Sequence, residues 1–151
     1  MAELKERLRA DLNTAMRARD QVRMRTLRMA LTSITNEEVA GAAARDLSDD
    51  EIVKVLTREA RKRREAAEAF SAAGRTDQAA AERAEGEILA DYLPAQLGDD
   101  ELAALVDAAI AETGASGMAS MGQVMKTVTP RIAGRADGAR VAAEVRRRLS
   151  G

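Results

Sequence analysis

The chain of 151 residues is 46% apolar and 32% charged, with 24 Lys and Arg side chains against 25 Asp and Glu side chains and a net charge of −1. It is rich in Ala and contains no Cys, no His and no Trp, with one Tyr and one Phe. These absences exclude disulfides, Cys- or His-ligated metals, catalytic sites that need a Cys or a His, and an aromatic platform for stacked bases. We therefore expect an all-α protein with no cofactor and no metal, whose chemistry would rest on carboxylates, lysines or hydroxyls.

Apolar residues recur every three or four positions through the first part of the chain, and this period predicts helices. The first helix carries Leu4, Leu8 and Leu12 on one face. Asp20 interrupts this pattern and is placed to cap a second helix, because a short acidic side chain accepts from the free amides of a first turn. The second helix is expected to fade near Gly41.

A third helix is predicted to begin at a capping box, in which the Ser48 hydroxyl accepts a backbone amide and Glu51 reaches back. It runs to about Ala73, where Gly74 can adopt the left-handed conformation that ends a helix. A fourth helix is predicted over residues 76–93.

Pro94 marks the best domain boundary in the chain, because it lacks an amide proton and disfavours helix at Leu93. The alternative is an ordinary turn between two helices of one domain. We expect an N-terminal bundle of about four helices over residues 1–93 and a small three-helix domain over residues 94–151.

Three helices are predicted beyond this boundary, and they are shorter than those before it. The first closes at Gly114, and the second opens at a capping box over residues 120–123. Pro130 is expected to end or kink the second helix. The last helix follows a turn over residues 134–138, with Asp137 as its N-cap.

Two motifs resemble functional sites but have simpler explanations. Residues 117–124 have the Gly spacing of a phosphate-binding loop, but Gln123 and Val124 stand where that loop requires Lys and Ser or Thr. The carboxylates of residues 49–51 and 99–101 could bind Mg²⁺ or act as acid and base, but both clusters open helices, where the helix dipole favours acidic groups. We therefore expect no catalytic residues.

The residues Met1–Arg7 contain no apolar segment of the kind that forms a secretory signal. No apolar run in the chain approaches the roughly 18 residues that a membrane span needs. We therefore expect a cytoplasmic protein that has no membrane partner.

Arginines gather in three places, near residues 17–28, 58–64 and 146–148. Each cluster has an interpretation as a solvated helix face with partners four residues away, such as Arg61 with Glu65. Arginine is also suited to bidentate contacts with phosphate. Since aromatic side chains are scarce, nucleic-acid binding would use the shape and backbone of a folded RNA.

Several segments carry a resemblance to a known family. Residues 122–126 and 134–137 resemble the tail domain of GatB, a subunit of the tRNA-dependent aspartyl/glutamyl amidotransferase. With the segment Tyr92–Leu97, they make the whole chain similar to the free-standing relatives of that tail, the YqeY-like family. Gly98 stands where a Ser cap is expected and Thr129 where a Met is expected, and both departures affect capping and packing only. Further matching segments are Asp11–Met16, Thr26–Arg28, Leu47–Glu51, Ala73–Arg75 and Glu87–Ile88.

The resemblance implies two all-helical parts and a non-catalytic accessory role in binding tRNA or a tRNA-handling complex, such as the amidotransferase or a tRNA synthetase. The family also carries a label of carbon–nitrogen ligase with glutamine as the amide donor. We interpret that label as inherited from the multi-domain relative, because the chain has no Cys for glutamine hydrolysis, no Ser-Lys amidase signature and no nucleotide-phosphate loop.

The hypothesis of RNA binding places the contacts near the glycine-rich turns, where backbone amides can approach phosphates and Asp137 fixes the following helix. If about four phosphates are neutralised, log affinity falls with log salt at a slope of about −3 to −4. The candidate RNA-binding residues are Lys126, Arg131, Arg135 and Arg140. A secondary basic patch is Arg25, Arg28, Arg61 and Arg64. The structural motif residues are Pro94, Gly122, Gly134, Asp137 and Gly138.

Two other hypotheses stay open. The net charge of −1 and the lack of aromatic platforms also fit a helical protein–protein adaptor without RNA contact. The third hypothesis is an enzyme, either an amidotransferase or one of unrelated activity.

Overall fold

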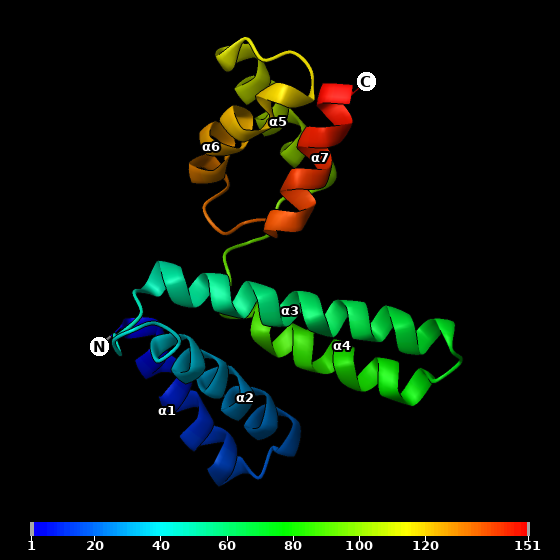
Figure 1. Ribbon diagram of the computed structural model, residues 1–151. Coiled ribbons are helices and arrows are strands. Elements are labelled where there is room, and N and C mark those ends of the chain that lie inside the picture. The colour runs from blue at the N-terminus through cyan, green and yellow to red at the C-terminus, as the bar shows by residue number, and fades with distance from the viewer. Residues whose placement is uncertain (1, 151) are drawn as a thin grey trace. The chain divides into compact units, whose positions relative to one another are not determined.

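The computed structural model describes residues 2–150, and every regular element in that range is helical (Figure 1). Over the described residues, seven α-helices and one short 3-10 helix follow one another, so the expected all-α class is confirmed. The contacts divide the chain between Leu93 and Pro94 into an N-terminal unit with α1–α4 and a C-terminal unit with α5–α7. Independent folding of the two units stays a prediction.

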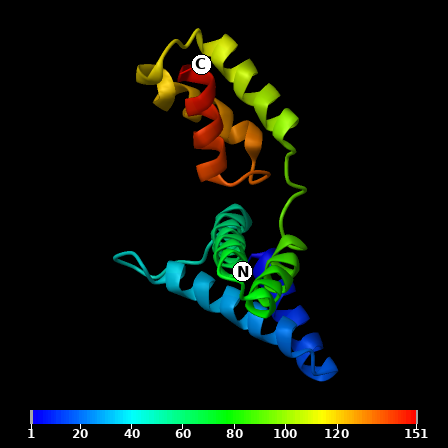
Figure 2. The same cartoon turned by 90° about the vertical axis from the view of Figure 1, so that its right-hand side faces the viewer.

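The N-terminal unit consists of two helical hairpins, α1 with α2 and α3 with α4 (Figures 1 and 2). The loop between α2 and α3 stands out from the unit in Figure 2. The four helices are α1 (Glu3–Ala18), α2 (Gln21–Glu38), α3 (Asp49–Ala72) and α4 (Thr76–Ala90). Their shared core includes Leu8, Leu27, Ile34, Ile52, Leu56 and Leu89, all fully buried.

The helix starts of this unit follow from the predicted caps. The Arg23 amide donates to Asp20 Oδ1 at 3.1 Å, which caps α2. At the start of α3, the Glu51 amide donates to the Ser48 hydroxyl at 3.2 Å, and the Ser48 amide donates back to the Glu51 carboxylate. A further hydrogen bond from Arg45 lowers the pKa of Glu51 to about 2. Gly74 has φ of +76° just beyond α3, as the predicted stop requires.

The helix α4 ends at Ala90, before the predicted end at residue 93. The amides of Tyr92 and Leu93 bond to the carbonyls three residues earlier, which tightens the chain into a turn. This turn places the Tyr92 ring in the core of the unit.

The C-terminal unit is built from three helices around a separate core. They are α5 (Asp99–Thr113), α6 (Met121–Ile132) and α7 (Gly138–Ser150), with the 3-10 helix η1 (Met118–Ser120) before α6. The core includes Leu97, Leu102, Val106, Val124, Val128 and Val145. None of the described helices in either unit combines the length and apolar character needed to span a membrane.

Two predictions for α6 are corrected by the structure. The Ser120 hydroxyl donates to the Ser116 carbonyl at 3.5 Å and caps no amide of α6, because η1 runs directly into that helix and leaves Ser120 at φ −92° and ψ 2°, outside the extended region of an N-cap. Of the two outcomes expected at Pro130, an end to the helix is wrong, because α6 continues to Ile132. The missing proline amide removes one hydrogen bond in the last turn only. The predicted end of α5 and the predicted start of α7 are confirmed. Gly114 is the C-cap of α5, and Asp137 accepts from the Ala139 amide at 2.9 Å at the start of α7.

Candidate nucleic-acid interface

Arg135 lies in the turn between α6 and α7 and is bound to the segment that precedes α5. Its Nε donates to the Ala95 carbonyl at 3.1 Å, and its guanidinium lies 3.8 Å from the Glu101 carboxylate. In the opposite direction, the Leu97 amide donates to the Arg135 carbonyl at 2.8 Å. Arg135 therefore holds residues 95–97 against the turn.

Arg140, in the first turn of α7, contacts the same segment. Its Nη1 donates to the Leu97 carbonyl at 2.8 Å, and its Nη2 donates to Asp99 Oδ1 at 2.7 Å. The structure thus brings Arg135 and Arg140 together at the start of α5. Both guanidinium groups combine a carbonyl partner with a carboxylate partner.

The other two candidates of this unit lie elsewhere on α6. Arg131 forms a close ion pair with Glu112, in the last turn of α5. Lys126 is exposed and has no hydrogen-bond or ion-pair partner among residues 2–150. Lys126 and Arg131 are five positions apart, which is about 140° of rotation around a helix. Lys126 and Arg131 therefore do not share one face of α6.

The glycine-rich motif has one conformationally demanding position. Gly134 has φ of +78°, follows Ala133 at +50°, and its carbonyl accepts from the Gln96 side chain at 3.3 Å. Gly122 and Gly138 have open space where a Cβ would stand, so close backbone approach within the unit does not explain them.

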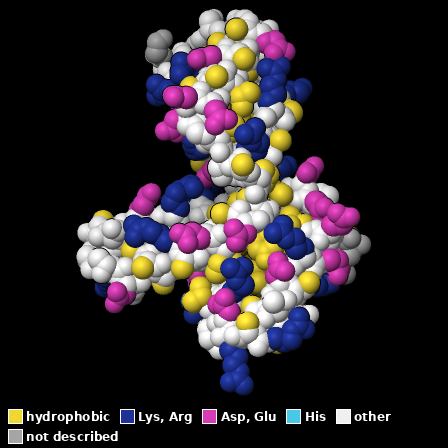
Figure 3. Space-filling model, turned by 180° about the vertical axis from the view of Figure 1, so that it is seen from behind, with side chains coloured by type: hydrophobic (Ala, Val, Ile, Leu, Met, Phe, Trp, Pro, Cys, Tyr) yellow, Lys and Arg dark blue, Asp and Glu magenta, His cyan; other side chains and the backbone are white. Residues whose placement is uncertain are grey.

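Most charges of the C-terminal unit are paired within it. The Glu144 carboxylate accepts from Arg147 at 2.7 Å and from Arg148 at 3.0 Å, and these hydrogen bonds lower the pKa of Glu144. Arg148 also lies 2.9 Å from Asp107. On the face shown in Figure 3, basic and acidic side chains of this unit are interspersed.

The four residues of the secondary patch have different surroundings. Arg25 donates to Glu85 of α4 at 3.0 Å, whereas Arg61 pairs along its own helix with Glu65 at 3.9 Å. Arg28 is exposed and has no side-chain partner in the described part of the chain, while Arg64 is exposed on α3. The expected pair of Arg61 and Glu65 is confirmed.

Sequence reasoning missed a largely buried ion network where α2, α3 and α4 meet. Arg63 of α3 lies 3.5 Å from Glu59 on the same helix and 3.1 Å from Glu85 on α4. Ser33 of α2 donates to Glu59 at 3.1 Å. The i,i+4 spacing of Glu59 and Arg63 was a signal, but the burial of Glu85 depends on how α4 packs.

A second missed cluster surrounds the single tyrosine. The Tyr92 hydroxyl donates to Asp11 Oδ2 at 2.5 Å, and the Arg7 guanidinium lies 4.5 Å from the ring centroid. Burial and the neighbouring carboxylate raise the pKa of Tyr92. This arrangement fixes the end of the unit to α1, because a phenol with a raised pKa stays protonated and keeps donating.

Within the described range, no group of three or more Asp or Glu side chains is arranged to hold a metal ion. The candidate interface therefore consists mainly of arginines, and their guanidinium groups are suited to binding anions such as phosphate. The YqeY-like protein family matches residues 5–149, and the chain belongs to this family. No match is found among curated proteins.

Proposed function

We propose that the chain is a non-catalytic accessory protein that binds folded RNA through the C-terminal unit, with tRNA as the ligand. It would act in the cytoplasm, either on tRNA alone or within a tRNA-handling complex such as an amidotransferase or a tRNA synthetase. Membership of the YqeY-like family supports this proposal at the level of the whole chain. The observation that carries it is the exposure of the carboxylates that hold Arg131, Arg135 and Arg140.

These carboxylates can be displaced by phosphate at little cost. The side chains of Asp99, Glu101 and Glu112 are 99%, 64% and 58% exposed. Exposed ion pairs contribute about 0–1 kcal/mol each. A phosphate offers the same planar guanidinium two acceptor oxygens, so the exchange replaces one charge-assisted pair by another.

The same exchange changes the expected salt dependence. Each phosphate contact releases a cation from the RNA, but each displaced carboxylate attracts a cation again. The slope of log affinity against log salt should therefore be shallower than about −3 to −4, the value for four unpaired cations.

Filter binding with bulk tRNA over a salt series tests the proposal. We expect Lys126→Glu and Arg131→Glu each to weaken binding about tenfold, since each places a repelling charge beside a phosphate. The two residues lie on different faces of α6, so this result requires a folded RNA that contacts both faces. Lys54→Glu is the matched control, because Lys54 is exposed and likewise has no side-chain partner among residues 2–150. Binding that is absent at low salt, or equally weakened by the control, would refute RNA binding at this site.

Arg135→Glu addresses the centre of the candidate interface. This change also breaks the hydrogen bond to Ala95, so its thermal unfolding is measured beside its tRNA affinity. A folded Arg135→Glu variant that binds tRNA as tightly as the unchanged protein would remove Arg135 from the interface.

A second candidate function is a helical protein–protein adaptor without RNA contact. The internal pairing of Arg131, Arg140 and Arg148 favours it, because paired arginines leave little net positive charge to attract a polyanion. A defined partner that stays bound after nuclease treatment, with no tRNA binding by the purified chain, would support the adaptor.

We also propose that the carbon–nitrogen ligase label does not describe the isolated chain. Glutamine hydrolysis by the purified protein, measured as ammonia release, is expected to stay at the rate of the buffer alone. Turnover that increases with protein concentration and survives further purification would contradict this.

A further inference from the structure

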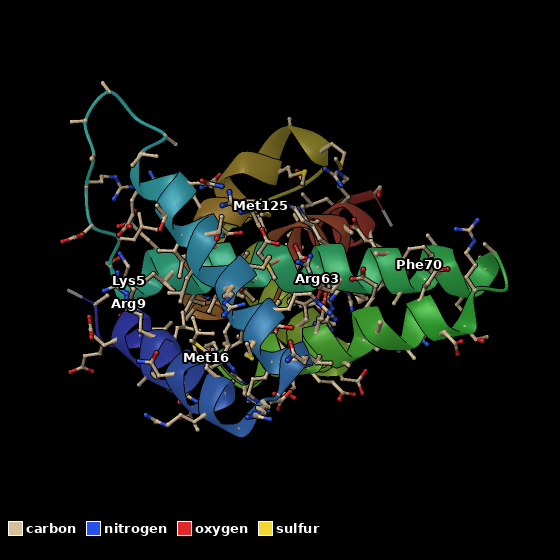
Figure 4. All side chains as sticks on the ribbon, turned by 90° about the horizontal axis from the view of Figure 1, so that it is seen from below. Lys5, Arg9, Met16, Arg63, Phe70 and Met125 are labelled. Carbon is tan, nitrogen blue, oxygen red and sulfur yellow. The ribbon has the colours of Figure 1, made fainter. Side chains whose placement is uncertain are left out.

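Four residues follow one line along α1. Lys5, Arg9, Leu12 and Met16 are spaced at i, i+4, i+7 and i+11, a spacing that keeps side chains on one helical face. Figure 4 labels three of them in sequence along the helix. The fully buried Leu8 belongs to the neighbouring face, which packs into the core.

A matching line runs along α2. Met24, Arg28, Leu31 and Glu38 are spaced at i, i+4, i+7 and i+14. The Lys5 ammonium donates to Glu38 Oε1 at 2.8 Å, which joins the two lines at one end. Because α1 and α2 form a hairpin, the lines run side by side in opposite directions.

We call the part of this double line beyond the Lys5–Glu38 ion pair the α1–α2 seam. It retains solvent exposure although it is partly apolar, with Met16 45% exposed. Leu12 and Leu31 are half-buried and pack against the core, and each leaves part of its side chain at the surface of the hairpin. The seam consists of Arg9, Leu12, Met16, Met24, Arg28 and Leu31.

Positive charge accompanies the seam. Arg28, within it, and Arg19, at the α1–α2 turn, have no side-chain partner among residues 2–150, and Arg17 bonds only to the Thr14 hydroxyl. The one acidic residue of the turn, Asp20, is engaged in capping α2. Methionine and arginine are both enriched in protein interfaces, and methionine adapts to different apolar partners.

We propose that the α1–α2 seam docks an amphipathic helix with acidic flanks from another protein. The apolar side chains of that helix would cover Met16 and its neighbours, while its carboxylates would pair with Arg28 and the arginines of the turn. An RNA backbone supplies the negative charge but no apolar surface, so it would leave the apolar line uncovered. Docking at the seam is independent of RNA binding by the C-terminal unit.

The test uses a labelled amphipathic peptide of about 18 residues, or five helical turns. It carries Leu on one face and Glu on both flanks, and a control peptide carries Lys in place of Glu. Fluorescence anisotropy with the full chain should show that the acidic peptide binds at least about tenfold more tightly. Equal binding of the two peptides, or no binding, would overturn the proposal.

Matched variants locate the contact. Met16→Asp and Arg28→Glu should each weaken binding of the acidic peptide about tenfold. Met118→Asp and Arg146→Glu should leave it unchanged, since Met118 is 46% exposed and Arg146 is exposed without an acidic partner in the described range. Thermal unfolding confirms that all four variants are folded. If Met118→Asp and Arg146→Glu weaken binding as much as Met16→Asp and Arg28→Glu do, the seam is not the binding site of the peptide.

Methionine methyl NMR gives a readout that needs no substitution. The seven methionines include two in the seam, so the peptide should shift the signals of Met16 and Met24 and leave Met118 unchanged. An RNA hairpin that displaces the peptide and shifts the same signals would overturn the protein partner in favour of RNA. Concentration-dependent dimerisation that Met16→Asp abolishes would instead assign the seam to a second copy of the chain.

Discussion

The charges of Lys5 and Glu38 are the most deeply buried ion pair of the described residues, with side chains 8% and 11% exposed. The Lys5 ammonium donates to both carboxylate oxygens, at 2.8 and 2.9 Å. Glu38 lies at the C-terminal end of α2, where the helix dipole disfavours an acidic group. The lysine, and not the helix, therefore stabilises the carboxylate.

We predict that Glu38→Gln lowers the free energy of unfolding by about 3 kcal/mol, because it leaves the Lys5 charge buried without a countercharge. The double variant Lys5→Met/Glu38→Leu should recover most of the loss, since two apolar side chains replace two buried charges. Urea unfolding of the three proteins measures this. If Glu38→Gln is as stable as the unchanged chain, water already screens the charges of Lys5 and Glu38.

The pair also predicts a pH dependence. The hydrogen bond from Lys5 holds the pKa of Glu38 below its ordinary 4.5, so the folded state binds a proton less readily than the unfolded state. The stabilisation is then fully present above pH 4.5 and is lost as the pH falls through the depressed pKa. In thermal unfolding, the difference in melting temperature between the unchanged chain and Glu38→Gln should become smaller below pH 4.5. A difference that stays constant to pH 2 would contradict this assignment.

At the residue scale, contacts between residues close in the sequence could be predicted, whereas contacts between residues far apart in the sequence could not. Ser48 and Asp20 cap helices because their acceptors lie within three residues of the amides that they bind. The partners of Arg135 could not be predicted, because Glu101 and Ala95 are separated from it by more than thirty positions. The candidate site was therefore predicted as a set of arginines without their carboxylates.

Among the helices, the α3–α4 hairpin has two glycines with opposite roles. Gly74 ends α3 with φ of +76°, whereas Gly86 lies inside α4, where an added Cβ would stand 3.7 Å from the Cβ of Arg63. That distance is an ordinary van der Waals contact.

Gly86→Ala should raise the free energy of unfolding by about 1 kcal/mol, because alanine is the better helix former and the space accepts its methyl group. Gly74→Ala should lower it by about 1 kcal/mol, since an L-residue is strained at this φ. Differential scanning calorimetry compares the two single variants. Destabilisation by Gly86→Ala would show that α3 and α4 have no room there for a methyl group.

The helices themselves could be predicted because their apolar period is long and unbroken, as in α5 and α3. The failures occur at helix ends, where tertiary contacts decide the outcome. Tyr92 leaves α4 because its ring packs into the core and its hydroxyl finds Asp11. Ser120 had the right spacing for a capping box, but η1 leaves its backbone outside the extended region in which an N-cap side chain reaches the first amides of a helix.

At the scale of the whole molecule, the two units have separate cores with no core residue in common. We propose that residues 1–93 and 94–151 are independent folding domains. Residues 94–151 expressed alone should give a helical circular dichroism spectrum and a cooperative thermal transition. A non-cooperative loss of signal would show that this unit depends on residues 1–93.

The link between the units has a consequence for any partner that engages both. Leu93 packs against the N-terminal core, and Leu97 is buried in the C-terminal core. Ala95 is already bonded to Arg135, and the proline ring fixes φ of Pro94 near −65°. A partner that binds both units gains avidity only if its two binding segments reach both sites at once, because the second contact is then intramolecular.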